Sequence, residues 1–510
     1  MKTIITFSSS HIRALVFFCI ILFCYLQVGY TQPVTLDPTF GQNGIIEIPH
    51  SSLFSEIRLL DFDKSGNIIA VGYTWENNKC YLMIVKTNSD GILDLNFGDN
   101  GIVRGSEALQ NAQLGLKITN ENKIFITGNF YAEQYGVFRR TYLQFNEDGS
   151  IDETFGDNGQ IIINSGNFPL YSLNTESADF ILFGGYDGDD PMHNPLIFKR
   201  NYDGSIDETF GENGVVYLTD HETYRITPNA IKILGDQSIL IVGGDWLNTE
   251  DAELAFCKLT PSGNLVTDFA NNGIWKMNIV SGGLPNRSES LRNVIENSNG
   301  EIVLTGIIAA GGPPPSLEAF VCKIHSGGIL NTSFGTDGFY DYGHINPFEP
   351  LLVEKILQNG SKYIVAFQND KIVSITHNGT LDTSFNNTGV FFCENYYYYM
   401  DVKLQDTNKL LLGGYSNGNA AIIRLNIPYE VSIKETPYSE NRITIYPNPA
   451  KDYLYFNSEQ RFEIMDIQGR ILLRSENPMQ SVNVSRLKAG VYFIKTITGA
   501  NTQIQKVIKL

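Results

Sequence analysis

The chain has 510 residues, of which 42% are hydrophobic and 12% aromatic, so it can bury a large core and a globally disordered chain is excluded. Its formal net charge is −18. Residues 441–510 hold ten lysines and arginines against five acids, whereas residues 32–440 hold 25 against 50, so an acidic body precedes a basic end. An acidic body argues against nucleic-acid binding, which needs a basic surface.

Residues 1–31 predict a secretory signal peptide. Basic residues precede an apolar run from Ala14 to Leu26, and small and polar residues follow it. The run is too short to span a bilayer comfortably, and no other stretch is long and apolar enough to do so. Bulky Phe23 stands where a lipoprotein site at Cys24 would carry a small residue, which disfavours a lipid anchor. A retained signal anchor stays open as the alternative.

Seven copies of one motif follow. Each has a Phe with a Gly four residues after it, and most have an Asp or Asn shortly before the Phe. The copies are LDPTFGQNG (36–44), LDLNFGDNG (93–101), IDETFGDNG (151–159), IDETFGENG (206–214), LVTDFANNG (265–273), LNTSFGTDG (330–338) and LDTSFNNTG (381–389). Between them recur β-rich segments such as NIIAVGYTW (67–75). This spacing predicts an all-β fold, a seven-bladed β-propeller with four-stranded antiparallel blades.

Each position that recurs among the seven copies of the motif has a physical role. We expect the Asp or Asn to cap a turn, the Phe to pack between neighbouring blades and the Gly to adopt a positive φ. The chain starts with one part of a unit and ends its repeats with the other part, AAIIRLNI (420–427). Together these two fragments complete a blade, so we expect a closed ring rather than an open solenoid with capping repeats.

The repeated motif resembles that of the delta-60 β-propeller repeat family, over residues 36 to about 428. The fifth copy departs from it, with Val266 and Ala270 in place of Asp and Gly, and the sixth and seventh copies carry Asn331 and Asn386. The resemblance implies a propeller in a bacterial secreted or surface setting. It supplies no catalytic residues.

Composition changes after Pro428. Residues 429–441 are expected to be a linker, and residues 442–510 a small β-sandwich. The last segment contains Tyr446-Pro447-Asn448-Pro449, Asp466-Ile467-Gln468-Gly469-Arg470, Leu487-Lys488-Ala489-Gly490-Val491-Tyr492 and Lys506-Val507-Ile508-Lys509-Leu510. These motifs resemble the type A C-terminal sorting domain of the type IX secretion system. An ordinary immunoglobulin-like module is the alternative.

The resemblance to a sorting domain implies a route. The signal peptide would take the chain across the inner membrane into the periplasm, and the type IX secretion machinery would export it through the outer membrane. The tag is commonly removed, and the protein is then released or attached to surface lipopolysaccharide. The resemblance also implies a Bacteroidetes-type source.

Catalytic signatures are missing from the sequence. It has no zinc-protease, serine-hydrolase, nucleotide or dinucleotide motif, so we assign no catalytic, cofactor-binding or metal residue and no cofactor. The six histidines beyond the signal are scattered, at His50, His193, His221, His325, His344 and His377. The cysteines Cys80, Cys257, Cys322 and Cys393 are too far apart for a zinc site, and one disulfide among them stays open.

Four local features have two readings each. Asp61 to Gly66 resembles the start of a calcium loop, but Gly72 replaces the closing Glu, which favours a hairpin turn. The recurring acids Asp152-Glu153 and Asp207-Glu208 cap turns or form an acid/base pair. Residues Tyr396 to Tyr399 pack between blades or form a stacking surface for glycans. Residues Gly311 to Pro315 are a connector or a partner-binding tip.

The leading functional prediction is a secreted or cell-surface, non-catalytic propeller that binds a ligand or partner, either a surface glycan or a protein. We expect a monomer. A polysaccharide-active hydrolase or lyase with its site in the channel is the alternative, and a structural surface component is a third. Converging carboxylates and histidines in the channel would favour the enzyme, whereas an aromatic-rimmed face would favour binding.

Overall fold

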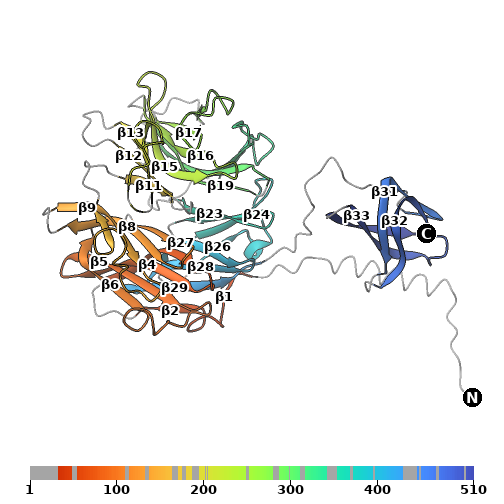
Figure 1. Ribbon diagram of the computed structural model, residues 1–510, viewed down its shortest axis with the longest axis horizontal. Coiled ribbons are helices and arrows are strands. Elements are labelled where there is room, and N and C mark those ends of the chain that lie inside the picture. The colour runs from red at the N-terminus through yellow and green to blue at the C-terminus, as the bar shows by residue number, and fades with distance from the viewer. Residues whose placement is uncertain are drawn as a thin grey trace, which may run out of the picture. The chain divides into compact units, whose positions relative to one another are not determined.

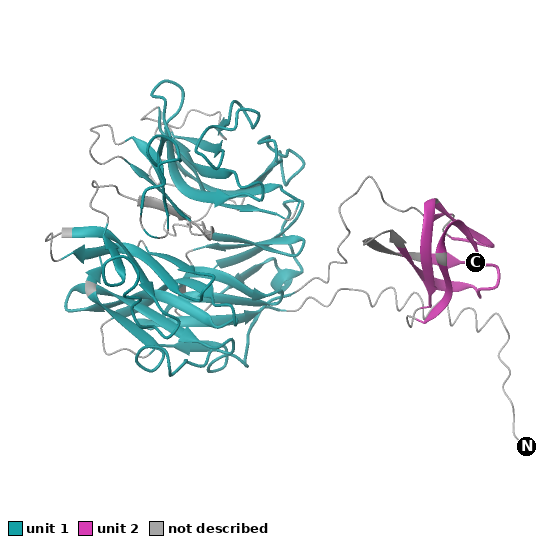
Figure 2. Cartoon of the chain, in the orientation of Figure 1, with its two compact units in different colours: residues 1–432 teal, residues 433–510 magenta. Residues whose placement is uncertain are grey.

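A computed structural model describes most of the chain beyond the predicted signal. The described residues are 33–48, 54–109, 114–132, 137–162, 170–174, 180–186, 194–201, 203, 205–247, 252–278, 287–297, 299–310, 316–341, 353–367, 371–393, 397–428, 445–446, 449–466, 470–498 and 501–510. The predicted signal (1–31), linker (429–441) and tip (311–315) lie outside them, as do His50, His193 and His344. The chain divides into two compact units, residues 1–432 and 433–510 (Figure 2).

The first unit is built from consecutive antiparallel sheets. Its first two groups of strands share one eight-stranded sheet, because the single residue pair Leu109–Phe130 joins β6 to β8. The strands are β3 (Phe54–Phe62), β4 (Ile68–Glu76), β5 (Lys79–Thr87), β6 (Ile102–Leu109), β7 (Gly115–Ile118), β8 (Ile124–Ala132), β9 (Val137–Phe145) and β10 (Gln160–Ile162).

Four further sheets follow, each of four strands in chain order. They comprise β11 (Leu170–Asn174), β12 (Phe180–Tyr186), β13 (Pro195–Asn201) and β14 (Val215–Tyr217); β15 (Ile226–Ile233), β16 (Ile239–Asp245), β17 (Glu253–Leu259) and β18 (Ile274–Met277); β19 (Arg287–Glu296), β20 (Ile302–Ala310), β21 (Ser316–Ile324) and β22 (Phe339–Asp341); and β23 (Val353–Asn359), β24 (Lys362–Phe367), β25 (Lys371–Thr376) and β26 (Val390–Phe392). A short 3-10 turn, η2 (Phe385–Asn387), precedes β26.

The last sheet of this unit combines both ends of the repeats. Strands β27 (Tyr397–Asp406), β28 (Lys409–Ser416) and β29 (Asn419–Asn426) come from the end of the unit. The N-terminal strands β1 (Thr35–Leu36) and β2 (Ile45–Glu47) both pair antiparallel with β29. The prediction that the two repeat ends complete one sheet is therefore confirmed.

Strands β11, β15, β19, β23 and β27, each the innermost strand of its sheet, lie toward the centre of the unit (Figure 1). Strand β3 contacts β7, and contacts then run from β11 to β15, β19, β23 and β27. Strand β27 in turn contacts β3, so β3 touches both β7 of the following group of strands and β27 of the last sheet. Sheets whose first strands surround a common centre form a propeller-like fold.

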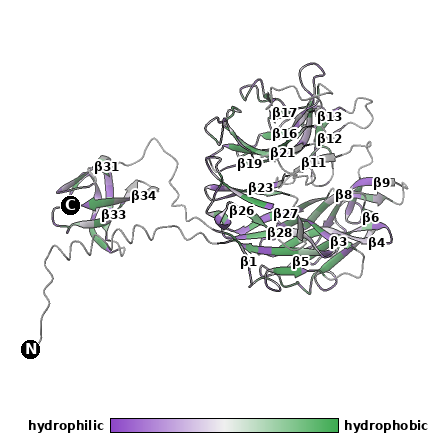
Figure 3. Cartoon of the chain, turned by 180° about the vertical axis from the view of Figure 1, so that it is seen from behind, coloured by the Kyte–Doolittle hydropathy of each residue, from purple (hydrophilic) through white to green (hydrophobic). Residues whose placement is uncertain are grey.

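The core lies between neighbouring sheets. The seven repeated Phe side chains, Phe40, Phe97, Phe155, Phe210, Phe269, Phe334 and Phe385, are each at most 8% exposed. Phe97 packs with Ile84 of β5 and also with Ile126 of β8, so it fills the space between two groups of strands. Hydrophobic residues accordingly follow the strands (Figure 3). The prediction that the Phe packs between units is confirmed.

The C-terminal unit is a five-stranded sheet in which β32 pairs with one side of β31. Its strands are β30 (Ile445–Tyr446), β31 (Tyr453–Met465), β32 (Ile471–Asn483), β33 (Gly490–Thr498) and β34 (Asn501–Lys509). Phe456, Phe462 and Ile494 belong to its core. Within the described part of the whole chain, no helix has both the length and the apolar character that a membrane crossing requires.

Candidate functional site

The repeated motifs lie at one end of the sheets, where their Asp or Asn side chains cap turns. Asp37 Oδ1 accepts hydrogen bonds from Thr39 N at 3.1 Å and Thr39 Oγ1 at 2.7 Å. The same pair of bonds recurs at Asp152, Asp207, Asn331 and Asp382. The predicted cap is therefore confirmed, and Val266 in the fifth copy has no side-chain oxygen to make it.

A backbone hydrogen bond also ties five of the motifs to a turn of the following repeat. Gly41 N donates to Asp90 O at 2.9 Å, and equivalent bonds start from Gly98, Gly211, Ala270 and Gly335. The partner turn must approach closely, because a Cβ on Gly91 would lie 2.8 Å from the Phe40 ring. The closing Gly of every motif has a positive φ, between 83° and 98°, as predicted.

The recurring aspartates Asp152 and Asp207 pair with lysines rather than with each other. Lys199 Nζ lies 2.8 Å from Asp207 Oδ2, and Lys123 pairs with Asp152. The hydrogen bond from Lys199, supported by Thr209, lowers the pKa of Asp207. These carboxylates are therefore committed to salt bridges and turn caps, which is the structural reading of the two predicted for them.

The calcium-like segment is also a turn. Asp63 Oδ1 accepts hydrogen bonds from Ser65 N and Asn67 N, and Lys86 Nζ lies 3.4 Å from Asp63 Oδ2. Lys403 Nζ lies 2.9 Å from Asp61 Oδ1. Within the described ranges, no group of three His, Cys, Asp or Glu side chains is placed to hold a metal ion.

The four cysteines beyond the signal are free thiols. Cys257, Cys322 and Cys393 are buried, and Cys80 is half-buried. Burial raises the pKa of Cys257 to about 12, which keeps this thiol protonated and unreactive. The expectation that Cys257 and Cys322 are small buried residues is confirmed.

His377 belongs to a cluster at the motif end of two neighbouring sheets. Its Nε2 lies 3.0 Å from Lys323 Nζ, and its Nδ1 lies 3.4 Å from the Tyr363 hydroxyl. Lys323 is itself paired with Glu301 at 2.7 Å. Lys86 occupies the equivalent position in β5, and its Nζ donates to Glu147 O of the following group of strands at 3.2 Å, so the cluster is a variant of a repeated contact between neighbouring repeats.

The first strands, which surround the centre, share a second repeated feature. Register shifts interrupt the pairing of first and second strands at Arg58, Tyr171, Asn229, Arg292, Glu354 and Met400. In a strand, side chains alternate between the two faces of the sheet, and a bulge changes the direction in which the extra residue's side chain points. Arg58 Nη1 reaches Met400 Sδ at 3.5 Å, so the bulged residues of β3 and β27 are in contact.

Two carboxylates of these first strands are held in ion pairs. Glu56 Oε1 lies 2.7 Å from Arg58 Nε, and Glu56 Oε2 accepts a 2.9 Å hydrogen bond from Tyr73. Burial raises the pKa of Glu56. Asp401 is 4% exposed, pairs with Lys355 and accepts a hydrogen bond from Leu60 N at 2.9 Å. Each carboxylate thus has its own cation.

Aromatic side chains gather at the other end of the sheets. Second strands start beside the motifs and finish at the opposite end, because β4 pairs antiparallel with β5, whose last residue precedes the motif. At or just after those finishing ends stand Trp75, Tyr131, Tyr186, Trp246 and Tyr415, from five sheets or half-sheets, and we call this group the aromatic end. Trp75 is 39% exposed and Tyr131 is 37% exposed, and the other three are half-buried.

Neighbouring rings extend this aromatic end. Tyr131 makes an edge-on contact with Phe138 of β9, with ring centroids 5.4 Å apart. Tyr415 makes a similar contact with Phe54 at 4.9 Å. The sequence contained a signal for it, since Trp75 and Trp246 both follow a second-strand Gly by three residues. The prediction centred on Tyr396 to Tyr399 instead.

Within that tyrosine run, Tyr399 has a structural role. It is 1% exposed, and its hydroxyl donates to Lys371 O and accepts from Phe367 N at 3.2 Å. It thereby links the last sheet to the preceding one, as the packing reading predicted. The side chains of Tyr396, Tyr397 and Tyr398 lie outside the described residues.

Solved structures with detectable likeness to the chain have low sequence identity and low TM-scores. BamB from Moraxella catarrhalis is 9% identical, with a TM-score of 0.34, over 78% of this chain and 99% of that one. The β-propeller domain of the trilobed protease from Pyrococcus furiosus is 9% identical, with a TM-score of 0.39, over 77% and 100%. Drosophila semaphorin 1a is 8% identical, with a TM-score of 0.38, over 74% and 87%. No curated protein matches the sequence.

The C-terminal unit does match a family. Four motifs in this unit, residues 446–449, 466–470, 487–492 and 506–510, resemble those of a sorting domain. Residues 444–510 match the model of the secretion system C-terminal sorting domain. The chain is therefore a protein with a propeller-like body that carries a type IX sorting domain at its C-terminus, and the secretion machinery is a partner of that domain.

Proposed function

We propose that residues 32–428 form a closed ring of seven blades, one for each Phe motif, and belong to the delta-60 repeat family. The seven buried Phe side chains support this count. So does the pairing of β1 and β2 with β29, which combines two incomplete units into one sheet. The ring then has no exposed sheet edge at its centre, which suits a protein that works outside the cell.

Residues 1–31, 429–441 and 442–510 complete the proposed organisation as signal peptide, linker and sorting domain, the last folded as a sandwich. The chain passes through the periplasm and then through the outer membrane of a Bacteroidetes-type cell. It is released or attached to surface lipopolysaccharide as a monomer. The family match over residues 444–510 supports the export step.

The function that the geometry favours is non-catalytic binding of a surface ligand or partner at the aromatic end. The observation that carries this proposal is the contrast between the two ends of the sheets. At the motif end, the repeated Asp, Phe and Gly residues are used in caps, packing and contacts between sheets. At the aromatic end, five sheets or half-sheets present partly exposed rings, which bury much area at little entropic cost when a partner binds.

A polysaccharide-active enzyme remains the second candidate. Glu56 is the observation in its favour, because its raised pKa is a property of general acids. Glycoside hydrolysis needs two carboxylates on opposite sides of one bond, however. Glu56 and Asp401 are instead held by Arg58 and Lys355 respectively, which favours a supporting role. A purely structural surface component would need neither Glu56 nor the exposed rings.

A binding screen with parallel turnover assays tests the proposal. The secreted chain is applied to immobilised glycans and outer-membrane proteins, and the same glycans are assayed for cleavage with and without chelator. Saturable binding without cleavage is expected. Cleavage that Glu56→Gln abolishes would assign the enzyme instead, and the absence of both binding and cleavage would leave the structural role.

A further inference from the structure

Trp246 is held more firmly than an ordinary surface tryptophan. Asp245, 3% exposed, accepts hydrogen bonds from the two backbone N–H groups of Arg225 and Leu247, at 2.9 and 3.0 Å. Trp246 N itself donates to Arg225 O at 2.9 Å. Lys276 Nζ lies 2.8 Å from Asp245 Oδ2 and neutralises this carboxylate. The backbone on both sides of Trp246 is thus fixed before any ligand binds.

The indole lies beside polar groups of two sheets. A Cβ built on Gly244 would lie 3.2 Å from Trp246 Nε1 and 3.3 Å from Ser290 Oγ, so both atoms stand over this glycine. Asn229 Nδ2 donates to Ser290 Oγ at 2.6 Å and to Leu291 O at 2.9 Å. Asn229 is the extra residue of the bulge in β15, which directs its side chain toward β19.

A further pair of hydroxyls continues this group of residues. Thr227 lies opposite Gly244 in the sheet, and its Oγ1 is 2.7 Å from the Tyr186 hydroxyl of the preceding sheet. The amide–hydroxyl pair of Asn229 and Ser290 therefore lies beside the half-buried Trp246 ring, and the hydroxyl pair of Thr227 and Tyr186 follows at the strand position opposite Gly244. We call these five residues, Tyr186, Thr227, Asn229, Trp246 and Ser290, the Trp246 site.

We propose that the Trp246 site binds a neutral glycan. An indole face is apolar and takes the C–H face of a sugar ring, while hydroxyl and amide groups around it match the sugar hydroxyls, which both donate and accept. The anionic alternatives are disfavoured by charge, because residues 32–440 hold twice as many acids as bases. This inference rests on the proposed binding function and names its ligand class.

The test uses the full secreted chain and soluble glucan, mannan and xylan as probes, with alginate as the anionic comparison. Affinities are measured by calorimetry for Trp246→Ala, Trp246→Phe and Gly244→Ala. Trp75→Ala is the matched control, since Trp75 occupies the same position in another unit. Thermal unfolding of each variant shows whether it is folded. Trp246 emission is followed in a chain in which Trp75 and Trp275 are replaced by Phe.

One neutral glycan is expected to bind and to change Trp246 emission. Trp246→Ala should lose about tenfold or more in affinity, Trp246→Phe should keep part of it, and Trp75→Ala should lose clearly less than Trp246→Ala. Gly244→Ala should weaken binding, because the added methyl displaces the indole or Ser290. Equal losses in Trp75→Ala and Trp246→Ala, or binding of alginate alone, would overturn the assignment. If a surface protein binds and no glycan does, the glycan is wrong and the binding function stands; if neither binds, both fail.

Discussion

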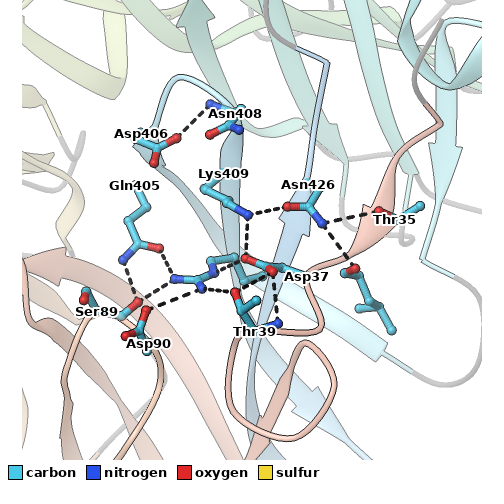
Figure 4. A network of polar contacts seen from close by, with 12 residues as sticks. Thr35, Asp37, Thr39, Ser89, Asp90, Gln405, Asp406, Asn408, Lys409 and Asn426 are labelled. Atoms are coloured by element: carbon cyan, nitrogen blue, oxygen red, sulfur yellow. Dashed lines mark hydrogen bonds and ion pairs between the residues drawn. The ribbon is translucent and has the colours of Figure 1, made fainter.

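The guanidinium of Arg424 lies 2.8 Å from the Asp37 carboxylate, although 387 positions separate the two residues in the chain. Lys409 pairs with the same carboxylate at 2.7 Å (Figure 4). Arg424 also donates to Ser89 O at 2.5 Å and stands 4.5 Å from the centre of the Phe40 ring. One arginine therefore connects the N-terminal segment, the last repeat strand and a turn of the first group of strands.

This contact predicts that closure depends on Asp37. Asp37 is 1% exposed, and burial opposes its ionisation, yet hydrogen bonds from Lys409 and Thr39 and the charge of Arg424 hold its pKa below the usual range. Asp37→Asn leaves two cations poorly compensated and should lower the free energy of unfolding by about 3 kcal/mol, as measured by urea denaturation. Asp94→Asn is the control: its carboxylate is one-third exposed and 4.0 Å from Lys86, so it should cost less than about 1 kcal/mol. Similar losses in the two variants would contradict a special role for the closing pair.

The fifth motif predicts a stabilising substitution. Ala270 has a φ of 50° where most other copies carry Gly, and a left-handed residue with a Cβ is strained. Ala270→Gly should raise stability by about 0.5–1 kcal/mol, since relief of strain exceeds the added entropy of the unfolded chain. The reverse change, Gly335→Ala, should destabilise the protein strongly, because its Cβ would lie 2.0 Å from Phe339 O. Thermal unfolding compares them, and destabilisation by Ala270→Gly would refute the strain argument.

His377 predicts a pH-dependent stability. Burial and, next, the charge of Lys323 lower the pKa of His377, while Glu301 opposes them. The unfolded chain therefore binds a proton at higher pH than the folded one, so stability should fall as pH drops below the ordinary imidazole value of 6.5. His377→Gln should flatten this part of the profile. Unfolding midpoints measured from about pH 8 to about pH 5 test it, and an unchanged slope in the variant would contradict it.

The sorting domain predicts a defect in export. A chain without residues 444–510 should accumulate inside the cell envelope, because the segment that the secretion machinery recognises is gone. Immunoblots of the medium, surface and periplasm measure its distribution. A chain with Asp37→Asn serves as a control for impaired folding with the sorting domain intact. Normal appearance of the truncated chain in the medium would show that another signal suffices.

Much of the fold could be predicted because the same residue types recur at the same positions of each repeat. Phe, Gly and Asp recur at fixed offsets, and each offset has one physical use: burial, positive φ or turn capping. The two half-units at the ends also predicted the pairing of β1 and β2 with β29. Such features depend on local sequence, so they can be recognised without coordinates.

The candidate site could not be predicted in the same way. The Trp246 site joins Tyr186, Thr227 and Ser290, which belong to three sheets, and their approach depends on the bulge in β15 and on Gly244. The ion pair between Lys199 and Asp207 could not be predicted from the sequence either, because the register between strands decides which side chains meet. One part of the site could be seen in the sequence. Trp75 and Trp246 occupy the same position of the repeat, and this recurrence indicates the aromatic end.

The central claim is that the aromatic end binds and the motif end holds the ring together. The most direct measurement compares two triple variants of the secreted chain for binding to intact cells, with unfolding midpoints recorded alongside. Trp75→Ala, Tyr131→Ala and Trp246→Ala together should abolish binding with little loss of stability, because these rings are exposed or half-buried. Asp152→Asn, Asp207→Asn and Asp382→Asn together should lower stability and leave the affinity of the folded protein unchanged. Binding that survives the aromatic variant, or that fails in a folded motif variant, would contradict the account.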